Sequence, residues 1–250
     1  MKKPIASIVV PLINWKQTDG FISSLTSWGL ADMPPDSVEL IVMDNGPDPV
    51  WPTSLKEASE DPRIRFVRAL RHSPTAPLHR SWNVGATYSA GHNIIVVNDD
   101  IIWGRRSVFN FCRALHLFKP SLWCCYPTPA STAEEALSLG NVVDRPPTLV
   151  GPPEFRGWAF AFSRVGWEGV GPFDEDFELL YGDDDCWMRT IEAGHPARQV
   201  DNAILYHLGS QSLWTVEGTG MSYNRDAARF KEKWGGRTGQ DFLKEKGFAS

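Results

Sequence analysis

Residues 94–100 of this chain read Ile-Ile-Val-Val-Asn-Asp-Asp, an apolar run that ends abruptly in one amide and two carboxylates. Three further apolar runs rich in β-branched residues precede it, at residues 5–13, 38–43 and 64–67. The apolar residues of these runs are continuous rather than alternating, which is typical of strands buried on both faces. The four runs therefore predict a mostly parallel sheet with helices on both sides.

The segments between these runs predict helices. Phe21, Leu25 and Trp28 are spaced as one face of a helix, and residues 81–90 and 105–118 also have helical patterns. Strands that alternate with helices indicate an α/β fold, with a Rossmann-like central, mostly parallel sheet in a single domain.

The second half of the chain gives weaker signals. Residues 126–154 are rich in Pro, Thr and Ser and predict a loop or flap. A helix is expected to begin near Asp183, a strand at residues 200–208 and a C-terminal helix at residues 222–234. The residues from Gly235 onward are interpreted as a loose tail.

Composition excludes several classes of protein. The chain has 250 residues, 42% of them hydrophobic and 22% charged, so wholesale disorder is excluded. Its net charge of −5 does not suit a protein that binds nucleic-acid duplexes. Its four cysteines form no Cys-x-x-Cys pair, and no apolar run approaches the roughly 18 residues of a membrane span. We expect a soluble cytoplasmic enzyme or binding protein with free thiols.

Polar side chains follow three of the predicted strands. Asn14 follows the first, Asp44 and Asn45 end the second, and residues 98–100 end the fourth. Each alone is readily explained as a turn or helix cap, but the carboxyl ends of parallel strands meet at one edge, where ligands bind. Neither Gly-x-Gly-x-x-Gly nor a P-loop occurs. Carboxylates here predict a hard divalent cation that binds a diphosphate.

A second group of acids lies at residues 183–185, followed by Arg189. Three adjacent carboxylates repel one another unless a cation or separated pKa values compensate. A solvated acidic helix start is the alternative, because acids favour helix N-termini. Arg189 is expected to pair with this cluster, as a plain salt bridge or with a catalytic role. His207 follows a predicted strand and, taken alone, is more typical of a structural residue.

From residue 5 to about residue 212 the chain resembles family-2 glycosyltransferases of the GT-A fold. The similarity rests on a series of short motifs that occur in the family's order and at sensible spacing. The motifs are Ile8-Val9-Val10-Pro11 with Asn14, residues 39–46, Asn83-x-Gly85, residues 96–100, Gly171-x-Phe173-Asp174-Glu175, residues 181–185 with Arg189, and His207-x-Gly209-x-Ser210.

The resemblance implies a GT-A glycosyltransferase domain at residues 1–215, followed by a C-terminal helix and tail at residues 216–250. Within the domain, residues 1–104 would form the nucleotide-sugar-binding half and residues 105–215 the acceptor-side half. The implied reaction is transfer of a sugar, with inversion, from a UDP-, dTDP- or GDP-linked donor to a hydroxyl of a glycan or another acceptor.

The resemblance also implies roles for individual residues. Asp100 and His207 would hold Mn²⁺ or Mg²⁺, which stabilises the diphosphate leaving group as a Lewis acid. Asp183 is the first candidate for the catalytic base and Asp184 the second, and a bound metal would favour the ionised state of Asp183. The residues expected at the donor are Pro11, Asn14, Asp44, Asn83, Asn98 and Asp99. The residues expected at the acceptor are Trp158 and Asp185.

Two positions depart from the family pattern. The metal motif reads Asn98-Asp99-Asp100 rather than Asp-x-Asp, so Asn98 can assist only as a neutral oxygen donor. Gly182 stands where the family usually has Glu. These losses leave open a catalytically inactive module that binds nucleotide sugars or glycans. A sugar-phosphate nucleotidyltransferase is a further alternative, but its Gly-rich basic loop has no counterpart in residues 11–19.

Overall fold

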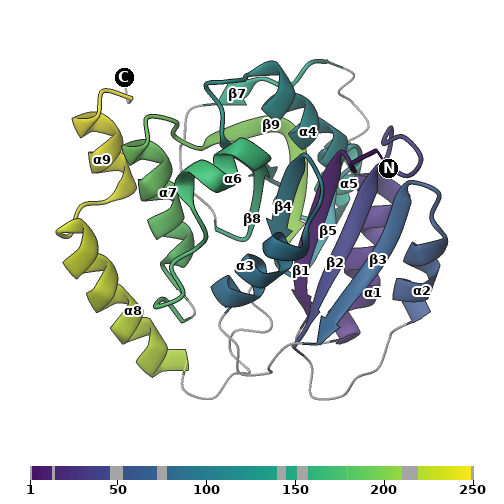
Figure 1. Ribbon diagram of the computed structural model, residues 1–250, viewed down its shortest axis with the longest axis horizontal. Helices are drawn as coiled ribbons and strands as arrows, with labels where there is room; N and C mark the ends of the chain where they lie inside the picture. The colour runs from purple at the N-terminus through teal and green to yellow at the C-terminus, as the bar shows by residue number, and fades with distance from the viewer. Residues whose placement is uncertain are drawn as a thin grey trace.

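The computed structural model describes residues 2–12, 15–45, 53–71, 78–139, 145–150, 157–178, 180–209 and 219–248. Its centre is a nine-stranded sheet in the order β3-β2-β1-β4-β8-β6-β9-β5, with β7 paired to β9 (Figure 1). The strands are β1 (Ala6–Leu12), β2 (Val38–Asp44), β3 (Ile64–Arg71), β4 (Asn93–Val97), β5 (Ile101–Trp103), β6 (Cys124–Pro129), β7 (Leu149–Val150), β8 (Ala159–Ser163) and β9 (Arg198–His207).

Helices cover both faces of this sheet (Figure 1). They are α1 (Trp15–Ser24), which continues as the π-helical turn η1 (Leu25–Gly29), α2 (Thr53–Glu60), α3 (Leu78–Tyr88), α4 (Ser107–Leu117), α5 (Ala133–Leu139), α6 (Arg164–Val170), α7 (Gly182–Glu192), α8 (Thr219–Trp234) and α9 (Gly239–Glu245). Two hydrophobic cores result, one against α1, α2 and α4 and one against α3, α7, α8 and α9. Neighbouring residues of β1, Ile8 and Val9, point into different cores, as the two-residue period of a strand requires.

The sheet is mostly parallel. β3, β2, β1 and β4 pair in parallel, and β6 and β9 run in the same direction, so six of the nine described strands share one direction. The antiparallel strands are β5, β7 and β8. The predicted α/β fold class is therefore confirmed, and the four apolar runs of the N-terminal half form β1 to β4.

The prediction of a loop or flap at residues 126–154 is wrong for residues 126–129, 133–139 and 149–150, which form strands and a helix. β6 lies inside the sheet between β8 and β9, and α5 and β7 follow it. A register shift between Pro127 and Thr128 interrupts the pairing of β6 with β9, which lets a strand tolerate proline. Proline content alone was therefore a misleading signal here.

The prediction of a loose tail after Gly235 is also wrong. Thr238 caps α9 by accepting a hydrogen bond from the backbone N–H of Asp241, whose carboxylate in turn accepts one from the backbone N–H of Thr238. Phe242 and Leu243 of α9 are buried in the core beside α7. The chain end described here is part of the packed structure.

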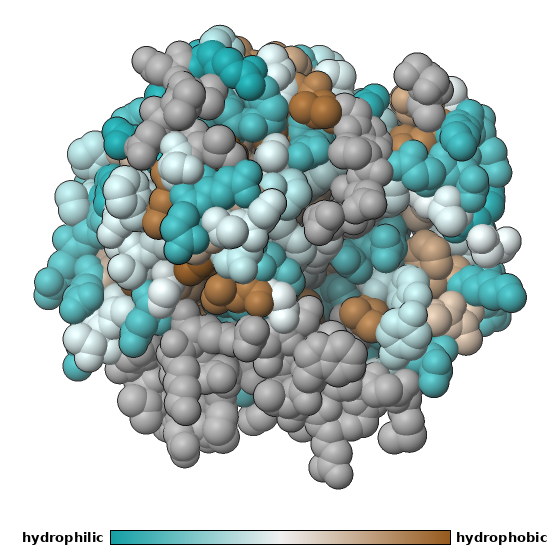
Figure 2. Space-filling model, turned by 180° about the vertical axis from the view of Figure 1, so that it is seen from behind, coloured by the Kyte–Doolittle hydropathy of each residue, from teal (hydrophilic) through white to brown (hydrophobic). Residues whose placement is uncertain are grey.

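None of the described helices combines the length and apolar character needed to cross a membrane. On the face opposite to Figure 1, hydrophobic residues form small separate patches among hydrophilic ones (Figure 2).

Candidate active site at the strand tips

The register of the parallel strands brings several predicted residues to one edge of the sheet. Leu12 of β1 is paired with Asp44 of β2, and Val9 of β1 is paired with Val96 of β4. The carboxyl ends of these three strands are therefore level, and residues 98–100 follow β4 directly. Asp44, Asp99 and Asp100 are all buried at this edge. Pro11 is buried within β1, and Asn14 lies outside the described residues.

His207 reaches the same edge from the far end of the sheet. β5 begins directly after Asp100 and pairs antiparallel with β9, so that Ile101 lies beside His207. His207 Nε2 lies 3.1 Å from Asp100 Oδ1. The sequence separates these two residues by more than a hundred positions, and the fold brings them together as predicted for a shared ligand.

Three polar atoms at this point are buried and have no hydrogen-bond partner among the described residues. They are Asn98 Oδ1, Asp100 Oδ1 and His207 Nε2. The approach of Asp100 to His207 is close enough for an ion pair, but it is not aligned as a hydrogen bond. Buried polar groups are nearly always hydrogen-bonded, so three such atoms gathered at the edge where α/β folds bind ligands make a candidate ligand site.

Trp158 lies beneath His207 rather than on a free surface. β8 pairs antiparallel with β4, and the backbone N–H of Asn98 donates to the carbonyl of Trp158 at 3.0 Å. The Trp158 ring stacks on the His207 imidazole, with centroids 5.3 Å apart and planes 7° apart. Its side chain is buried. Trp158 therefore fixes the orientation of His207, and its predicted contact with an acceptor stays a prediction without support from these contacts.

Asp183 stands in the first turn of α7, beside the segment that leads into Trp158. The Asp183 carboxylate lies directly over Gly157, so closely that a Cβ on that glycine would overlap it. Burial, together with the neighbouring Asp184 charge, raises the pKa of Asp183 to about 8, although backbone N–H groups of the helix start oppose this. These surroundings favour the protonated form of Asp183, and the expected effect of a bound metal on its ionisation stays a prediction.

Asp184 faces a different space from Asp183. It lines a cavity of about 580 Å³ between α7, α8 and the turn before α9. Burial raises the pKa of Asp184 to about 6. The two neighbouring candidates for the base are therefore separated by direction, one toward the strand tips and one toward α8.

Asp185 is fully buried, and both oxygens of its carboxylate have partners. Arg189 Nε lies 2.9 Å from Oδ2, while Lys233 Nζ and Trp234 Nε1 lie 2.7 Å and 2.9 Å from Oδ1. The predicted pairing of Arg189 with the acidic cluster is seen here as a salt bridge. These contacts anchor α8 to α7 and leave Asp185 no surface for an acceptor, so its predicted acceptor role is not favoured.

Asn83 likewise has a structural position. Its side-chain amide donates to Phe173 O at 2.9 Å and to Glu175 Oε1 at 3.0 Å, and its oxygen accepts from the Phe173 backbone N–H at 2.9 Å. Asn83 thus fastens α3 to the segment that precedes α7. Its predicted role at the donor stays a prediction, since its amide hydrogens are already used.

Two residues that the sequence did not single out shape the site. Gly157 provides the space for Asp183, as described above. His79 is buried against Gly182, where an added Cβ would lie 2.5 Å from the ring, and burial lowers the pKa of His79. Its Nδ1 lies 3.1 Å from Phe177 O. The imidazole of His79 therefore occupies the room that a larger side chain at position 182 would need.

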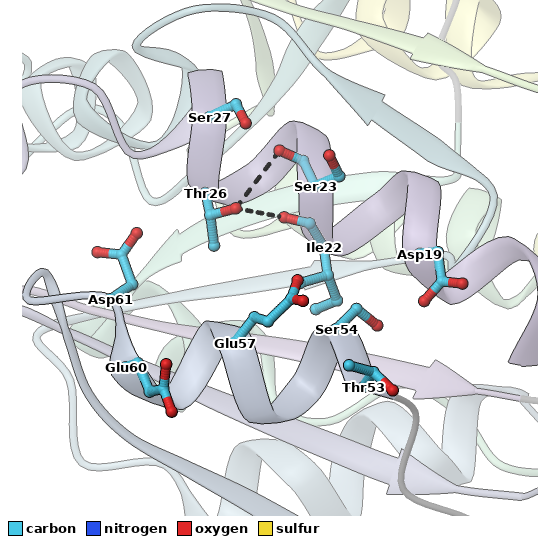
Figure 3. A pocket seen from close by; sticks show the side chains of 10 residues that line it. All are labelled: Asp19, Ile22, Ser23, Thr26, Ser27, Thr53, Ser54, Glu57, Glu60 and Asp61. Atoms are coloured by element: carbon cyan, nitrogen blue, oxygen red, sulfur yellow. Dashed lines mark hydrogen bonds between the residues drawn. The ribbon is translucent and has the colours of Figure 1, made fainter.

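A second cavity, of about 570 Å³, lies between α1 and α2 and is lined by hydroxyl and carboxylate side chains (Figure 3). The Thr26 hydroxyl there is already bonded to the backbone of α1, at Ile22 and Ser23 (Figure 3). None of the predicted site residues lines this cavity. Asp44, residues 98–100 and His207 lie at the strand tips instead.

Comparison with solved structures supports the fold, although comparison of sequences gives no match. No family model matches the chain, and no curated protein sequence matches it. Among solved structures, a mannosyltransferase from Pyrobaculum calidifontis in complex with GDP-Man and Mn²⁺ has a TM-score of 0.64 at 15% identity, over 99% of this chain and 70% of that one. GalNAc-T7 with UDP, GalNAc and Mn²⁺ also has a TM-score of 0.64, at 12% identity, over 92% of this chain and 48% of that one.

A third solved structure, described as a mycobacterial protein, has a TM-score of 0.57 at 16% identity, over 93% of this chain and 75% of that one. At these identities the likeness is one of fold. The chain has the fold of GT-A glycosyltransferases, which confirms the predicted architecture.

Proposed function

We propose that this protein is a metal-dependent, inverting glycosyltransferase of the family-2 type. It would transfer a sugar from a nucleoside-diphosphate donor to an acceptor hydroxyl. The observation that carries the proposal is the cluster of buried atoms on Asn98, Asp100 and His207, which have no hydrogen bond among the described residues and lie at the edge where α/β folds bind ligands. The fold shared with two nucleotide-sugar transferases crystallised with Mn²⁺ supports it.

The residues present fit a divalent cation. Asp100 offers a carboxylate oxygen, His207 an imidazole nitrogen and Asn98 an amide oxygen, and each of these atoms lacks a hydrogen bond. Within the described ranges no three His, Cys, Asp or Glu side chains converge on a metal, so the donor diphosphate would complete the ligand set. A nitrogen ligand favours Mn²⁺ over Mg²⁺. Such an ion supplies Lewis-acid stabilisation of the leaving diphosphate.

The chain's own residues then perform the proton transfer. Asp183 accepts the proton of the acceptor hydroxyl while the acceptor oxygen bonds to the anomeric carbon of the sugar. The bond from that carbon to the diphosphate breaks, and the nucleoside diphosphate leaves with the bonding electrons. A positioned base contributes about 10²–10⁴-fold to such a step. Asp44, Asp99 and Pro11 at the adjacent strand tips would contact the nucleoside.

Calorimetric titration with UDP-, GDP- and dTDP-sugars, each with and without Mn²⁺, tests the proposal. We expect one donor to bind and to need Mn²⁺. In Asp100→Ala that dependence should disappear, whereas Glu192→Ala, an exposed acid on α7, should bind as the wild type does. Unchanged metal dependence in Asp100→Ala would move the metal site elsewhere.

The same titration separates the alternatives. Donor binding without release of nucleoside diphosphate would indicate an inactive binding module. Silence with every donor, followed by nucleotidyl transfer from a nucleoside triphosphate to a sugar phosphate, would indicate a nucleotidyltransferase.

A further inference from the structure

A third cavity lies at the edge of the sheet opposite to the strand tips. It reaches Ile5, directly before β1, and Asn93, the first residue of β4, so it opens where these two parallel strands begin. Its volume of about 560 Å³ falls in the range of about 300–1,000 Å³ that holds small ligands. None of the residues proposed for the active site lines it. A ligand bound here would therefore occupy a site separate from the strand tips.

One face of α4 forms a long wall of this cavity. The lining residues of α4 occur at positions i, i+3, i+4, i+7 and i+8, which share one side of a helix, and they are Phe109, Cys112, Arg113, His116 and Leu117. From the first to the last of them the helix rises by about 12 Å. Burial raises the pKa of the Cys112 thiol to about 12, so the thiol stays protonated at neutral pH and adds to the apolar part of the wall.

Two other segments add apolar surface to the same cavity. Ile5 comes from the residues before β1, and Met33 and Pro34 come from the turn before β2. Together with Phe109 of α4 they provide hydrophobic contacts for a ligand that is itself apolar over much of its length. The cavity is therefore more than a patch of charged surface.

The charged groups that line this cavity are all basic. They are Arg113 and Lys119, with His92 and His116 beside them, and no Asp or Glu lines it, although the net charge of the chain is −5. Arg113 is half-buried. Among the residues that the structure describes, its guanidinium has no hydrogen bond or ion pair, and neither has the Lys119 ammonium. An anion would supply the counter-charge that the lining does not.

The helix dipole explains only part of this basic group. Basic side chains near the C-terminus of a helix often serve to offset the dipole, which accounts for His116 in the last turn of α4 and for Lys119 just after it. Arg113 precedes that turn, and His92 belongs to the segment before β4. Neither is explained by the end of α4, and the dipole gives no reason for the apolar residues between them.

We propose that this cavity binds an amphipathic anion, a molecule with one carboxylate or phosphate head group on a medium-length alkyl chain. The head group would pair with Arg113 and Lys119. The chain would lie along α4 against Phe109 and Leu117. Guanidinium groups bind carboxylate and phosphate alike through paired N–H donors, so the two head groups share one chemistry. The inference does not depend on the proposed function, because the site is separate from the strand tips.

An amphipathic anion fits the cavity better than a ligand with only one of its two parts. A neutral apolar molecule would cover the apolar walls but would take the water from Arg113 without offering it a counter-charge. A small inorganic anion would pair with Arg113 but would leave the apolar walls in water. A molecule with both parts satisfies the two walls at once.

Isothermal titration calorimetry on the full chain tests the proposal, with octanoate and octyl phosphate as probes. 1-Octanol has the same chain without the charge, and acetate has the charge without the chain. We expect at least one octyl anion to bind the wild type, 1-octanol to bind at least about tenfold more weakly, and acetate not to bind. The tighter of the two octyl anions identifies the head group.

Three variants locate the binding in this cavity. Arg113→Gln should weaken the octyl anion by about tenfold and leave 1-octanol unchanged, because it removes a charge-assisted hydrogen bond. Leu117→Ala should weaken the anion through its chain. Lys56→Gln removes an exposed positive charge from α2, outside the cavity, and should bind as the wild type does. Circular dichroism of each variant verifies folding.

Several results would overturn the inference. They are silence with both octyl anions, equal binding of an octyl anion by wild type and Arg113→Gln, and binding of 1-octanol as tight as that of the anions. Flotation with phosphatidylglycerol vesicles covers the remaining source of such a head group. Binding to these vesicles without binding of either octyl anion would assign the basic residues to a membrane surface and would also overturn the site for a free ligand.

Discussion

Acidic side chains are buried in two regions of the molecule, at the contact between α7 and α8 and at the strand tips. The two regions differ in how many hydrogen-bond and ion-pair partners these side chains have. At the helix contact, Asp185 has Arg189, Lys233 and Trp234 as partners. The fully buried Asp226 of α8 accepts backbone hydrogen bonds from Glu178 at 3.2 Å and Leu180 at 3.0 Å.

At the strand tips three buried polar atoms have no hydrogen bond among the residues that the structure describes. They are Asp100 Oδ1, His207 Nε2 and Asn98 Oδ1. Backbone N–H groups at the start of α7 oppose the rise in the pKa of Asp183. A saturated acid stabilises the fold, whereas an unsaturated buried one costs stability and is retained where a ligand completes it. The comparison therefore distinguishes structural from functional acids more sharply than their sequence does.

The largest effect is expected from Asp183→Asn. The amide keeps the shape of the side chain but cannot accept the proton, so release of nucleoside diphosphate should fall by about 10²–10⁴-fold. Donor binding measured by titration should remain. Asp184→Asn is the matched neighbour, and because Asp184 faces α8 rather than the strand tips, it should lower the rate much less. Turnover of Asp183→Asn at the wild-type rate would remove Asp183 from the base role.

Asp185→Ala should destabilise the contact between α7 and α8, where the Asp185 carboxylate has three partners. Removing one partner of a buried ion pair leaves the other charge uncompensated, and the free energy of unfolding should drop by about 3–5 kcal/mol. Urea denaturation measures this, with Glu192→Ala on the same helix as an exposed control that should change by less than about 0.5 kcal/mol. Equal stability of the two variants would mean that Asp185 is not a structural acid.

The free energy of unfolding should depend on pH through Asp183, which stands near the strand tips. Because the pKa of Asp183 is raised from 3.8 to about 8, the folded protein keeps a proton there that the unfolded chain has already lost. Stability contributed by this group therefore falls as pH rises between these values. Relative to Asp183→Asn in EDTA, the wild type should lose about 1–2 kcal/mol from pH 6 to pH 8, less than the full linkage value because the group is half-buried. A difference that is constant with pH would contradict the raised pKa.

The grouping of polar residues at the strand tips could be predicted because its determinants are local. Continuous apolar runs define buried parallel strands, and the residues after each run must meet at one edge. Asp44 and residues 98–100 were found in this way, whereas His207, taken alone, is more typical of a structural residue. The resemblance to a known family added the pairing of Asp100 with His207 across the sheet.

What the sequence could not give depends on contacts between distant segments. Asp185 lies within a run of three acids, and its Trp234 partner comes 49 residues later on another helix. Nothing in the run distinguishes Asp183, which faces Gly157, from Asp184, which faces α8. The space that His79 takes beside Gly182 is equally invisible before the chain folds.

The smallest effect on the free energy of unfolding is expected from a substitution at the cap of α9. Thr238 and Asp241 form a capping box at the start of α9, a short motif that could have predicted this helix from the sequence. Thr238→Ala should lower the free energy of unfolding by about 0.5–2 kcal/mol, since one backbone N–H of α9 loses its acceptor. Urea denaturation measures the loss, with the exposed Glu232→Ala of α8 as control. If Thr238→Ala were as stable as the control, the packing of α9 against α7 through Phe242 and Leu243 would contribute nothing to the free energy of unfolding.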